Sequence, residues 1–166
     1  MIKNNMGNFK FIALNHQEFD GLDDLSEQEL SERDIVRIKV DTYPGFPCRI
    51  TLEDAEIGED VFLLNYNYHS AHSPYKASGP VFIRNNSKTK DYPINEIPEM
   101  FLHRCLSLRA YDENGMMQKA DVLEGNRLKD KIEDFFNDEK IDYLHIHNAK
   151  PGCFNCVVKK VQNADQ

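Results

Sequence analysis

The sequence predicts an α+β fold: one domain spanning residues 1–166, with a largely antiparallel sheet and one main helix. Many short apolar or alternating segments, each bounded by Pro, Gly or polar residues, have the length and composition of strands. One segment has the apolar spacing of an amphipathic helix. A repeated alternation of strand and helix, which would indicate a parallel sheet, is missing. At this length a core forms without a metal ion or a disulfide.

In the first half of the chain, β-branched and alternating apolar residues indicate strands. The strands are expected at residues 9–14, 35–40, 48–52, 61–66 and 80–84. Ser26 and Glu29 have the spacing of a capping box and open a short peripheral helix. Residues 67–79 are rich in Ser, His, Pro and Tyr, which is the composition of a loop. We expect this loop, in particular residues 73–79, to cover a ligand.

The second half contains the main helix, at about residues 126–137. Leu128, Ile132, Phe135 and Phe136 fall at i, i+4, i+7 and i+8, which places them on one stripe of a helix. A shorter helix is expected at residues 94–103, and strands at residues 106–111, 116–123, 141–148 and 154–161. Turns at residues 112–115 and 151–152 join these four strands into two hairpins.

Charge and hydropathy exclude several partners. The net charge of -8 at pH 7 opposes binding to phosphate backbones and anionic lipid, so neither nucleic acid nor a membrane is expected as a partner. The opening residues lack the apolar core of a signal peptide, and no apolar run approaches the ~20 residues that span a bilayer. We therefore expect a cytoplasmic protein with reduced cysteines, which are Cys48, Cys105, Cys153 and Cys156. No cofactor is expected, and the oligomeric state is left open.

Polar side chains gather on one face of the predicted sheet, because alternate residues of a strand point the same way. This face carries Tyr143, His145 and His147 on one strand and Ser107, Arg109 and Tyr111 on another. If the two strands are neighbours, Arg109 meets His145 and His147, and Arg49 from a further strand joins them. Arginine has the forked donors that bind a carboxylate or a phosphate. The alternative is a face that is simply solvated, as on many antiparallel sheets.

The densest group of reactive side chains lies in residues 145–153. For cysteine chemistry, Cys153 would be the nucleophile, His147 its base and Asn148 the residue that orients the base. The alternative for Cys153 is that it packs as a small apolar residue. His145 and His147 have a spacing that also occurs in zinc sites, but a metal needs further ligands. The sequence offers Cys153, Cys156, His103, His69 or His72 for this role and fixes none of them in space, so no metal site is assigned.

Three functions fit these residues. The leading hypothesis is a site for a small anionic metabolite, with Arg49, Arg109, His145 and Tyr75 as ligand-binding residues and His147, Asn148 and Cys153 as catalytic residues. His147 suits proton transfer because an unperturbed pKa near 6.5 leaves both of its forms accessible at neutral pH. A structural or protein-interaction module without catalysis is the first alternative. The second is a metal-dependent enzyme that uses His145 and His147, and whether the protein is an enzyme is left open.

Four segments together resemble a bacterial family catalogued as domain of unknown function 1203. They are residues 44–49 (PGFPCR), 63–66 (LLNY), 73–80 (SPYKASGP) and 145–153 (HIHNAKPGC). Members of that family end in a similar His-x-His-Asn-Ala stretch followed by Gly-Cys and usually an aromatic residue, here Phe154. The resemblance covers most of the chain and implies recurrent motifs that contain Cys48, Arg49, His145, His147, Asn148 and Cys153. It implies no established activity, and Cys156 lies outside the pattern.

Overall fold

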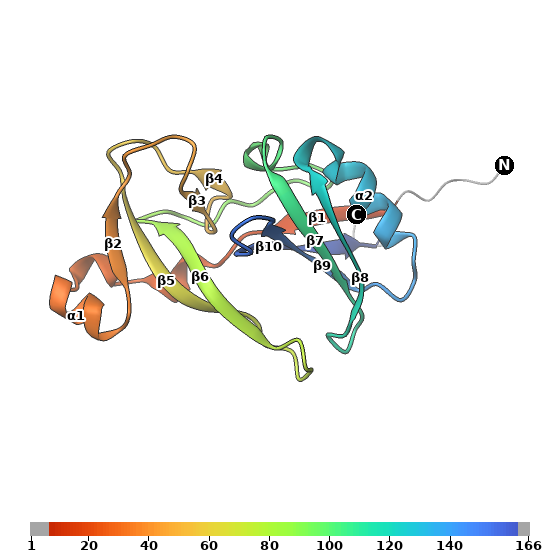
Figure 1. Cartoon of the computed structure of the whole chain (residues 1–166), viewed down its shortest axis with the longest axis horizontal. Coiled ribbons are helices and arrows are strands. Elements are labelled where there is room, and N and C mark those ends of the chain that lie inside the picture. Colours follow the sequence, from red (N-terminus) through yellow and green to blue (C-terminus); the bar gives the residue numbers. More distant parts are fainter. Residues whose placement is uncertain (1–6, 163–166) are drawn as a thin grey trace.

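The protein is built from two five-stranded sheets and a few short helices, which confirms the α+β prediction. The structure, a computed structural model, describes residues 7–162; residues 1–6, which belong to the segment without a signal-peptide core, lie outside the described residues. Figure 1 shows the two sheets side by side, with the longest helix, α2, next to the first of them. Within residues 7–162 no helix is long and apolar enough to cross a membrane.

The first sheet is antiparallel throughout, in the order β1-β10-β9-β7-β8. Its strands are β1 (Asn8–Ile12), β10 (Phe154–Val161), β9 (Tyr143–Asn148), β7 (Cys105–Tyr111) and β8 (Met117–Glu124). The second sheet has the order β2-β5-β6-β3-β4, and only its β3–β6 pair is parallel. Its strands are β2 (Val36–Lys39), β5 (Asp60–His69), β6 (Ala77–Arg84), β3 (Pro47–Cys48) and β4 (Glu53–Asp54).

The helices are short and lie at the periphery of the sheets. They are α1 (Glu27–Glu32), α2 (Leu128–Phe136) and the 3-10 helices η1 (His16–Phe19), η2 (Leu22–Asp24), η3 (Glu99–Phe101) and η4 (Gly125–Arg127). The predicted capping box forms at α1, where the Ser26 hydroxyl accepts a hydrogen bond from Glu29 N and the Glu29 carboxylate accepts one from Ser26 N. The four apolar residues predicted for the stripe of α2 are buried, so the main helix is confirmed.

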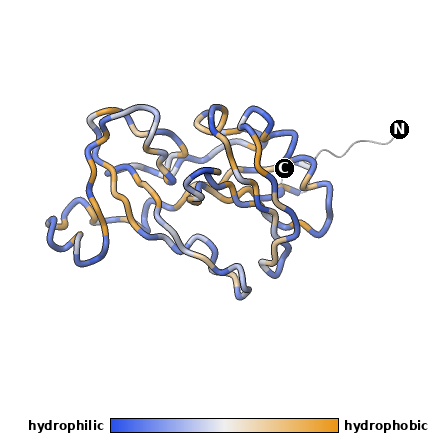
Figure 2. The backbone as a smooth tube through the Cα atoms, in the orientation of Figure 1, coloured by the Kyte–Doolittle hydropathy of each residue, from blue (hydrophilic) through white to orange (hydrophobic). Residues whose placement is uncertain are grey.

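Each sheet buries one main apolar face. In the first sheet, Leu106, Leu108, Leu144 and Ile146 pack in one core cluster with the apolar side of α2. A second cluster centres on the second sheet and includes Phe154 from β10 of the first, so the two sheets share apolar contacts. Figure 2 shows these hydrophobic stretches following the strands, with hydrophilic turns between them. The opposite face of the first sheet, which carries the predicted polar residues, is therefore turned away from α2.

The expected strand at residues 48–52 is wrong beyond its first residue. Only Pro47 and Cys48 pair, as β3, and the chain then turns, with Leu52 in the left-handed region at φ 52°. A hydrogen bond of 2.9 Å from Leu52 N to Cys48 O closes this turn. The turn carries the side chain of Arg49 into the interior instead of along a sheet face, where it is buried.

The expected loop at residues 67–79 is too long, because strands occupy both of its ends. β5 continues to His69 and β6 begins at Ala77, and these two residues pair with each other, so residues 70–76 alone connect the strands. The expected helix at 94–103 is reduced to the single 3-10 turn η3. Pro98 lacks the N–H group that a helix over residues 94–103 would need to bond to the carbonyl oxygen of Ile94.

Candidate functional site

The two polar strands of the first sheet are neighbours, as the proposed convergence requires. In the antiparallel pairing of β7 and β9, Ser107 lies opposite His147, and Arg109 lies opposite His145. Arg109 Nε donates a hydrogen bond of 3.3 Å to Ser107 Oγ, so its guanidinium is drawn toward the strand position beside His147. The strand alternation in the sequence therefore placed these side chains on one face correctly.

This polar face is covered, so the alternative of a solvated face is wrong. His145 and His147 are 1% and 0% exposed. The end of β5 lies over them: the ring centroid of Tyr68 is 5.1 Å from that of His147, and the ring centroid of His69 is 4.8 Å from that of His145. Tyr68 and His69 were assigned to a loop from the sequence, and the signal for their position was the continuing alternation of aromatic and polar residues along β5.

The hairpin formed by β5 and β6 covers the polar face, and its tip is anchored to the turn between β7 and β8. Ser73 Oγ donates a hydrogen bond of 2.8 Å to the carbonyl oxygen of Gly115, in the turn between β7 and β8. His69 Nδ1 donates to the Tyr75 carbonyl oxygen at 2.8 Å, which leaves Nε2 to accept the proton of the Tyr143 hydroxyl at 2.6 Å. The hairpin is thus fixed to the first sheet at two points, from Ser73 at its tip and from His69 at the end of β5.

Two imidazole nitrogens on this face lack partners. His147 Nδ1 donates to the Gly152 carbonyl oxygen at 2.9 Å, so Nε2 carries the lone pair. Of the four buried side-chain polar atoms without a hydrogen-bond partner among the described residues, two are His147 Nε2 and His145 Nδ1. Buried polar atoms in folded proteins usually have a partner in the protein, a water or a ligand. These two nitrogens are therefore the unsatisfied groups of the polar face.

Both histidines are neutral at physiological pH. Burial lowers the pKa of His145 to about 3, with a further contribution from the nearby His69. Burial also lowers the pKa of His147 to about 4, although its hydrogen bond to Gly152 acts in the opposite direction. The expectation that both forms of His147 are accessible near pH 7 therefore fails, because the charged form would lose its hydration. His147 can still accept a hydrogen bond or a proton at Nε2.

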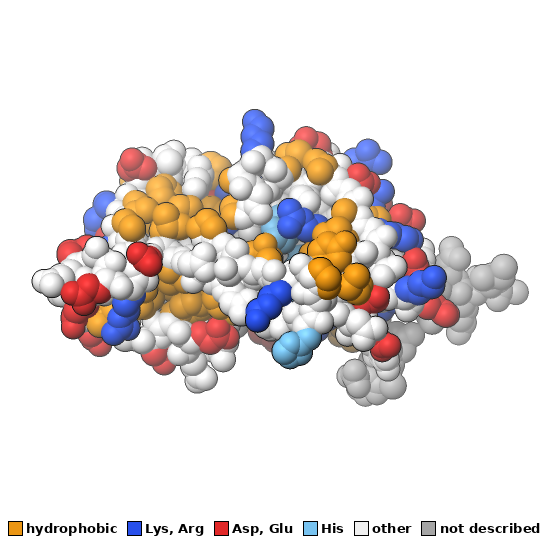
Figure 3. Space-filling view, turned by 60° about the horizontal axis from the view of Figure 1, so that its bottom comes forward, with side chains coloured by type: hydrophobic (Ala, Val, Ile, Leu, Met, Phe, Trp, Pro, Cys, Tyr) orange, Lys and Arg blue, Asp and Glu red, His pale blue; other side chains and the backbone are white. Residues whose placement is uncertain are grey.

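Arg109 is half-buried, and no carboxylate within residues 7–162 forms an ion pair with it. Burial raises the pKa of the Tyr111 hydroxyl, and the positive charge of Arg109 opposes this rise, which places the two groups close together. Tyr75, 39% exposed, stands edge-on to Tyr111 with ring centroids 6.0 Å apart. Figure 3 shows a histidine side chain beside a Lys or Arg side chain near the middle of that view.

Arg49 lies in the interior between the two sheets. It is 1% exposed, and burial lowers its pKa. Its Nε donates to the Phe154 carbonyl oxygen at 2.8 Å, its Nη1 to the Pro47 carbonyl oxygen, and its Nη2 to Cys153 Sγ at 3.3 Å. All three nitrogens are therefore engaged inside the protein, and Arg49 links the start of β10 in the first sheet to β3 in the second.

The predicted turn at residues 151–152 forms, with Gly152 at φ 77°, and Cys153 follows it half-buried. Cys153 Sγ accepts a second hydrogen bond, from Asn148 Nδ2 at 3.3 Å, and Asn148 Oδ1 in turn accepts one from Asn155 Nδ2 at 2.9 Å. The partners of Cys153 are therefore Arg49 and Asn148, and His147 is hydrogen-bonded to Gly152 instead. The arrangement differs from a cysteine and histidine dyad.

A three-ligand metal site is not formed around the paired histidines. In the part of the chain that the structure describes, no group of three His, Cys, Asp or Glu residues is placed to hold a metal ion. His69 is the histidine that packs against His145, and both of its nitrogens are already hydrogen-bonded. Cys156 lies in the core on the α2 side, where burial raises its pKa.

The family follows from a comparison of the chain with known families. Residues 45–160 match the model of the family described as Protein of unknown function (DUF1203). This chain belongs to the DUF1203 family. No curated protein and no solved structure matches it. The matched range contains all of the four resemblance segments except Pro44. Bacterial origin and a cytoplasmic location stay predictions.

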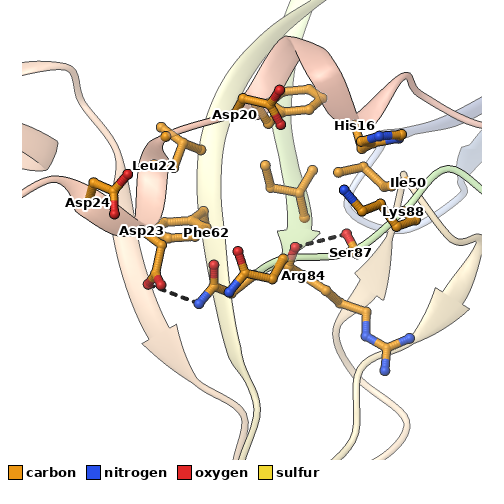
Figure 4. A pocket seen from close by; sticks show the side chains of 15 residues that line it. His16, Asp20, Leu22, Asp23, Asp24, Ile50, Phe62, Arg84, Ser87 and Lys88 are labelled. Carbon is orange, nitrogen blue, oxygen red and sulfur yellow. Dashed lines mark hydrogen bonds between the residues drawn. The ribbon is translucent and has the colours of Figure 1, made fainter.

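Two hollows of this DUF1203 protein are lined by residues other than Arg109. One, of about 240 Å³, lies between the η1–η2 segment and the end of β6, and Figure 4 shows Asp20, Asp23, Asp24 and Lys88 around it. A hydrogen bond from Arg37 lowers the pKa of Asp23 there. The other, of about 610 Å³, is lined by Tyr68, His69, Tyr143, His145, Val157 and Lys159. Of the predicted site residues, only His145 reaches either hollow.

Proposed function

We propose that this protein binds a small anionic molecule on the polar face of its first sheet. Arg109 holds the negative charge, and His145, His147 and Tyr75 surround the ligand. The observation that carries the proposal is a combination on one face: an arginine without a carboxylate partner and two buried imidazole nitrogens without hydrogen-bond partners, among the residues that the structure describes. A bound molecule that accepts hydrogen bonds from Arg109 and contacts the histidines would satisfy all three groups.

The ion pairs of other arginines in the protein support an anionic ligand for Arg109. Arg37, Arg84 and Arg104 each form an ion pair with an aspartate or glutamate of the protein. The chain has 28 acidic against 20 basic residues, so acidic partners are abundant, yet none of those within residues 7–162 pairs with Arg109. A half-buried guanidinium is stabilised by an anion held in its fork. Nε of Arg109 donates to Ser107 Oγ, so the terminal nitrogens of its guanidinium are the donors that we propose for the ligand.

The test is isothermal titration of the protein with a panel of small carboxylates and phosphates. Arg109→Ala should weaken binding at least tenfold, because a charge-assisted hydrogen bond contributes about 1.5–3 kcal/mol, while the matched variant of an exposed arginine, Arg127→Ala, should bind as the parent does. Arg109→Ala should also change the free energy of unfolding by less than about 1 kcal/mol. A large loss of stability without any ligand binding would favour a structural role for Arg109.

A second candidate function, thiol chemistry at Cys153, is favoured by the state of Arg49. The guanidinium is buried and has no ion pair with a carboxylate among the described residues, and Cys153 Sγ is its only hydrogen-bond partner that can carry negative charge. The thiolate is the nucleophilic form of cysteine, and donors from Arg49 and Asn148 would hold its charge.

Alkylation with iodoacetamide, followed by peptide mass spectrometry, tests this candidate. Cys153 should react faster than Cys105, which is also half-buried but accepts no side-chain hydrogen bond at its sulfur. The Asn148→Ala variant, which removes one donor and keeps Arg49, should slow the reaction of Cys153 and leave that of Cys105 unchanged. Equal rates at the two cysteines in the parent protein would count against thiol chemistry.

A further inference from the structure

The charge on the polar face limits which anion can bind there. Arg109 supplies one positive charge, while the nitrogens of Arg49 donate to groups within the protein. His145 and His147, with pKa values of about 3 and about 4, are neutral. A carboxylate balances a single positive charge, whereas a phosphate monoester carries about -1.5 to -2 at pH 7. Excess charge in a half-buried site is costly because it loses hydration.

Aromatic rings pack around the two histidines of the polar face. Tyr68 is stacked on Phe154, with centroids 4.9 Å apart and an interplanar angle of 4°, and Tyr111 is stacked on Tyr143 at 5.3 Å and 17°. Tyr75 stands edge-on to Tyr111 at the exposed side. Flat ligands with an apolar body gain from such ring faces and edges, and the gain is absent for a small hydrophilic anion.

His147 adds a requirement for a hydrogen-bond donor. Its Nδ1 proton is used by the Gly152 carbonyl oxygen, so Nε2, which is buried and without a partner, can only accept. A carboxylate cannot satisfy this nitrogen, because an ionised carboxylate has no proton to donate. A hydroxyl group elsewhere on the same ligand can.

We propose that the ligand is an aromatic monocarboxylate that also carries a hydroxyl group: Arg109 binds the carboxylate, the tyrosines flank the ring, and His147 Nε2 accepts the hydroxyl proton. This inference rests on the proposed anion site and specifies its ligand class. The distance that separates carboxylate from hydroxyl is set by the spacing of Arg109 and His147 on adjacent strands.

Isothermal titration with benzoate, its three hydroxy isomers, the matching methoxybenzoates and phenyl phosphate tests the ligand class. One hydroxybenzoate should bind about tenfold tighter than benzoate, the gain expected of one well-formed hydrogen bond, and its methoxy analogue should lose that gain. Phenyl phosphate should bind more weakly than that hydroxybenzoate. In His147→Phe the ratio between hydroxybenzoate and benzoate should fall to about one; the methoxy comparison in the parent protein gives the same information if this variant does not fold.

The outcomes separate the ligand class from the anion site. Tightest binding of phenyl phosphate, or equal binding of the hydroxy and methoxy compounds, would overturn the hydroxy-monocarboxylate class while leaving an anion site at Arg109. Absence of binding by every carboxylate and phosphate, or equal binding to the parent and Arg109→Gln, would overturn the anion site itself. Arg127→Gln serves as the control for the removal of an exposed arginine.

Discussion

Acidification should destabilise this protein through His147, and the variant His147→Gln isolates that effect. Burial holds the pKa of His147 at about 4 in the folded protein, against about 6.5 in an unfolded chain. Between these two values the unfolded chain binds a proton that the folded protein does not. The contribution of His147 to stability is therefore complete above pH 6.5 and is lost as the pH falls toward 4.

The size of the effect follows from the two pKa values. At pH 5 an unfolded histidine is almost fully protonated, and the folded His147 is almost fully neutral, so protonation stabilises the unfolded chain by about 2 kcal/mol relative to pH 7. His145, whose pKa is about 3, contributes a similar amount. The variant His147→Gln loses the contribution of His147 and keeps that of His145. The free-energy difference between parent and variant should consequently shrink by about 2 kcal/mol from pH 7 to pH 5.

The assay is urea denaturation of parent and variant at both pH values, with the slope of the unfolding free energy against urea checked for constancy. Carboxylates and other histidines titrate in the same range, but they are common to both proteins and cancel in the difference. His72→Gln, at an exposed position of the β5–β6 connection, serves as the control for the loss of a histidine side chain. A parent-to-variant difference that stays constant between pH 7 and pH 5 would refute the argument that His147 is buried in its neutral form.

Three further substitutions test the structure around the site, each by its effect on the urea midpoint. Arg49→Met should destabilise the protein by about 2–4 kcal/mol, since two buried carbonyl oxygens lose their donor; no loss would mean that Arg49 does not link the sheets. Asp54→Asn should cost about 3–5 kcal/mol, because Asp54 (side chain 2% exposed) forms the ion pair of Arg104, and an effect below 1 kcal/mol would contradict that burial. Gly125→Ala should prevent normal folding, because its Cβ would lie 1.6 Å from the Phe101 carbonyl oxygen; wild-type stability would show that this approach is looser.

The sequence predicted the polar face because strand alternation is a local property. Residues two apart point the same way in any strand, so the partition of His145 and His147 from Leu144 and Ile146 needed no knowledge of partners. The pairing of β7 with β9 could not be predicted from this alternation, because antiparallel strands can be arranged in several orders within a sheet. The apolar stripe of α2 was equally local, and its four residues are buried.

The covering of that face was not predictable by the same reasoning. Polar residues at alternate positions usually indicate a solvated side, and composition placed Tyr68 and His69 in a loop. Their location depends on the length of β5, which is fixed by pairing with β6 and by contacts with the first sheet. Arg49 was misplaced for a related reason: the turn at residues 49–52 is closed by Leu52 N to Cys48 O, and a long-range hydrogen bond from Leu14 N to Arg49 O ties it to the start of the chain.

The chemistry of the polar face depends on whether water or the second sheet covers it. In water, His145 and His147 would titrate near pH 6.5 and their unpaired nitrogens would be hydrated. Under β5 both are neutral, and unsatisfied nitrogens carry a cost of about 1–3 kcal/mol each. A fold held together only by packing would be more stable with apolar residues at these two positions. The proposed binding of a small anion would account for their presence beside Arg109, the half-buried arginine without an acidic partner within residues 7–162.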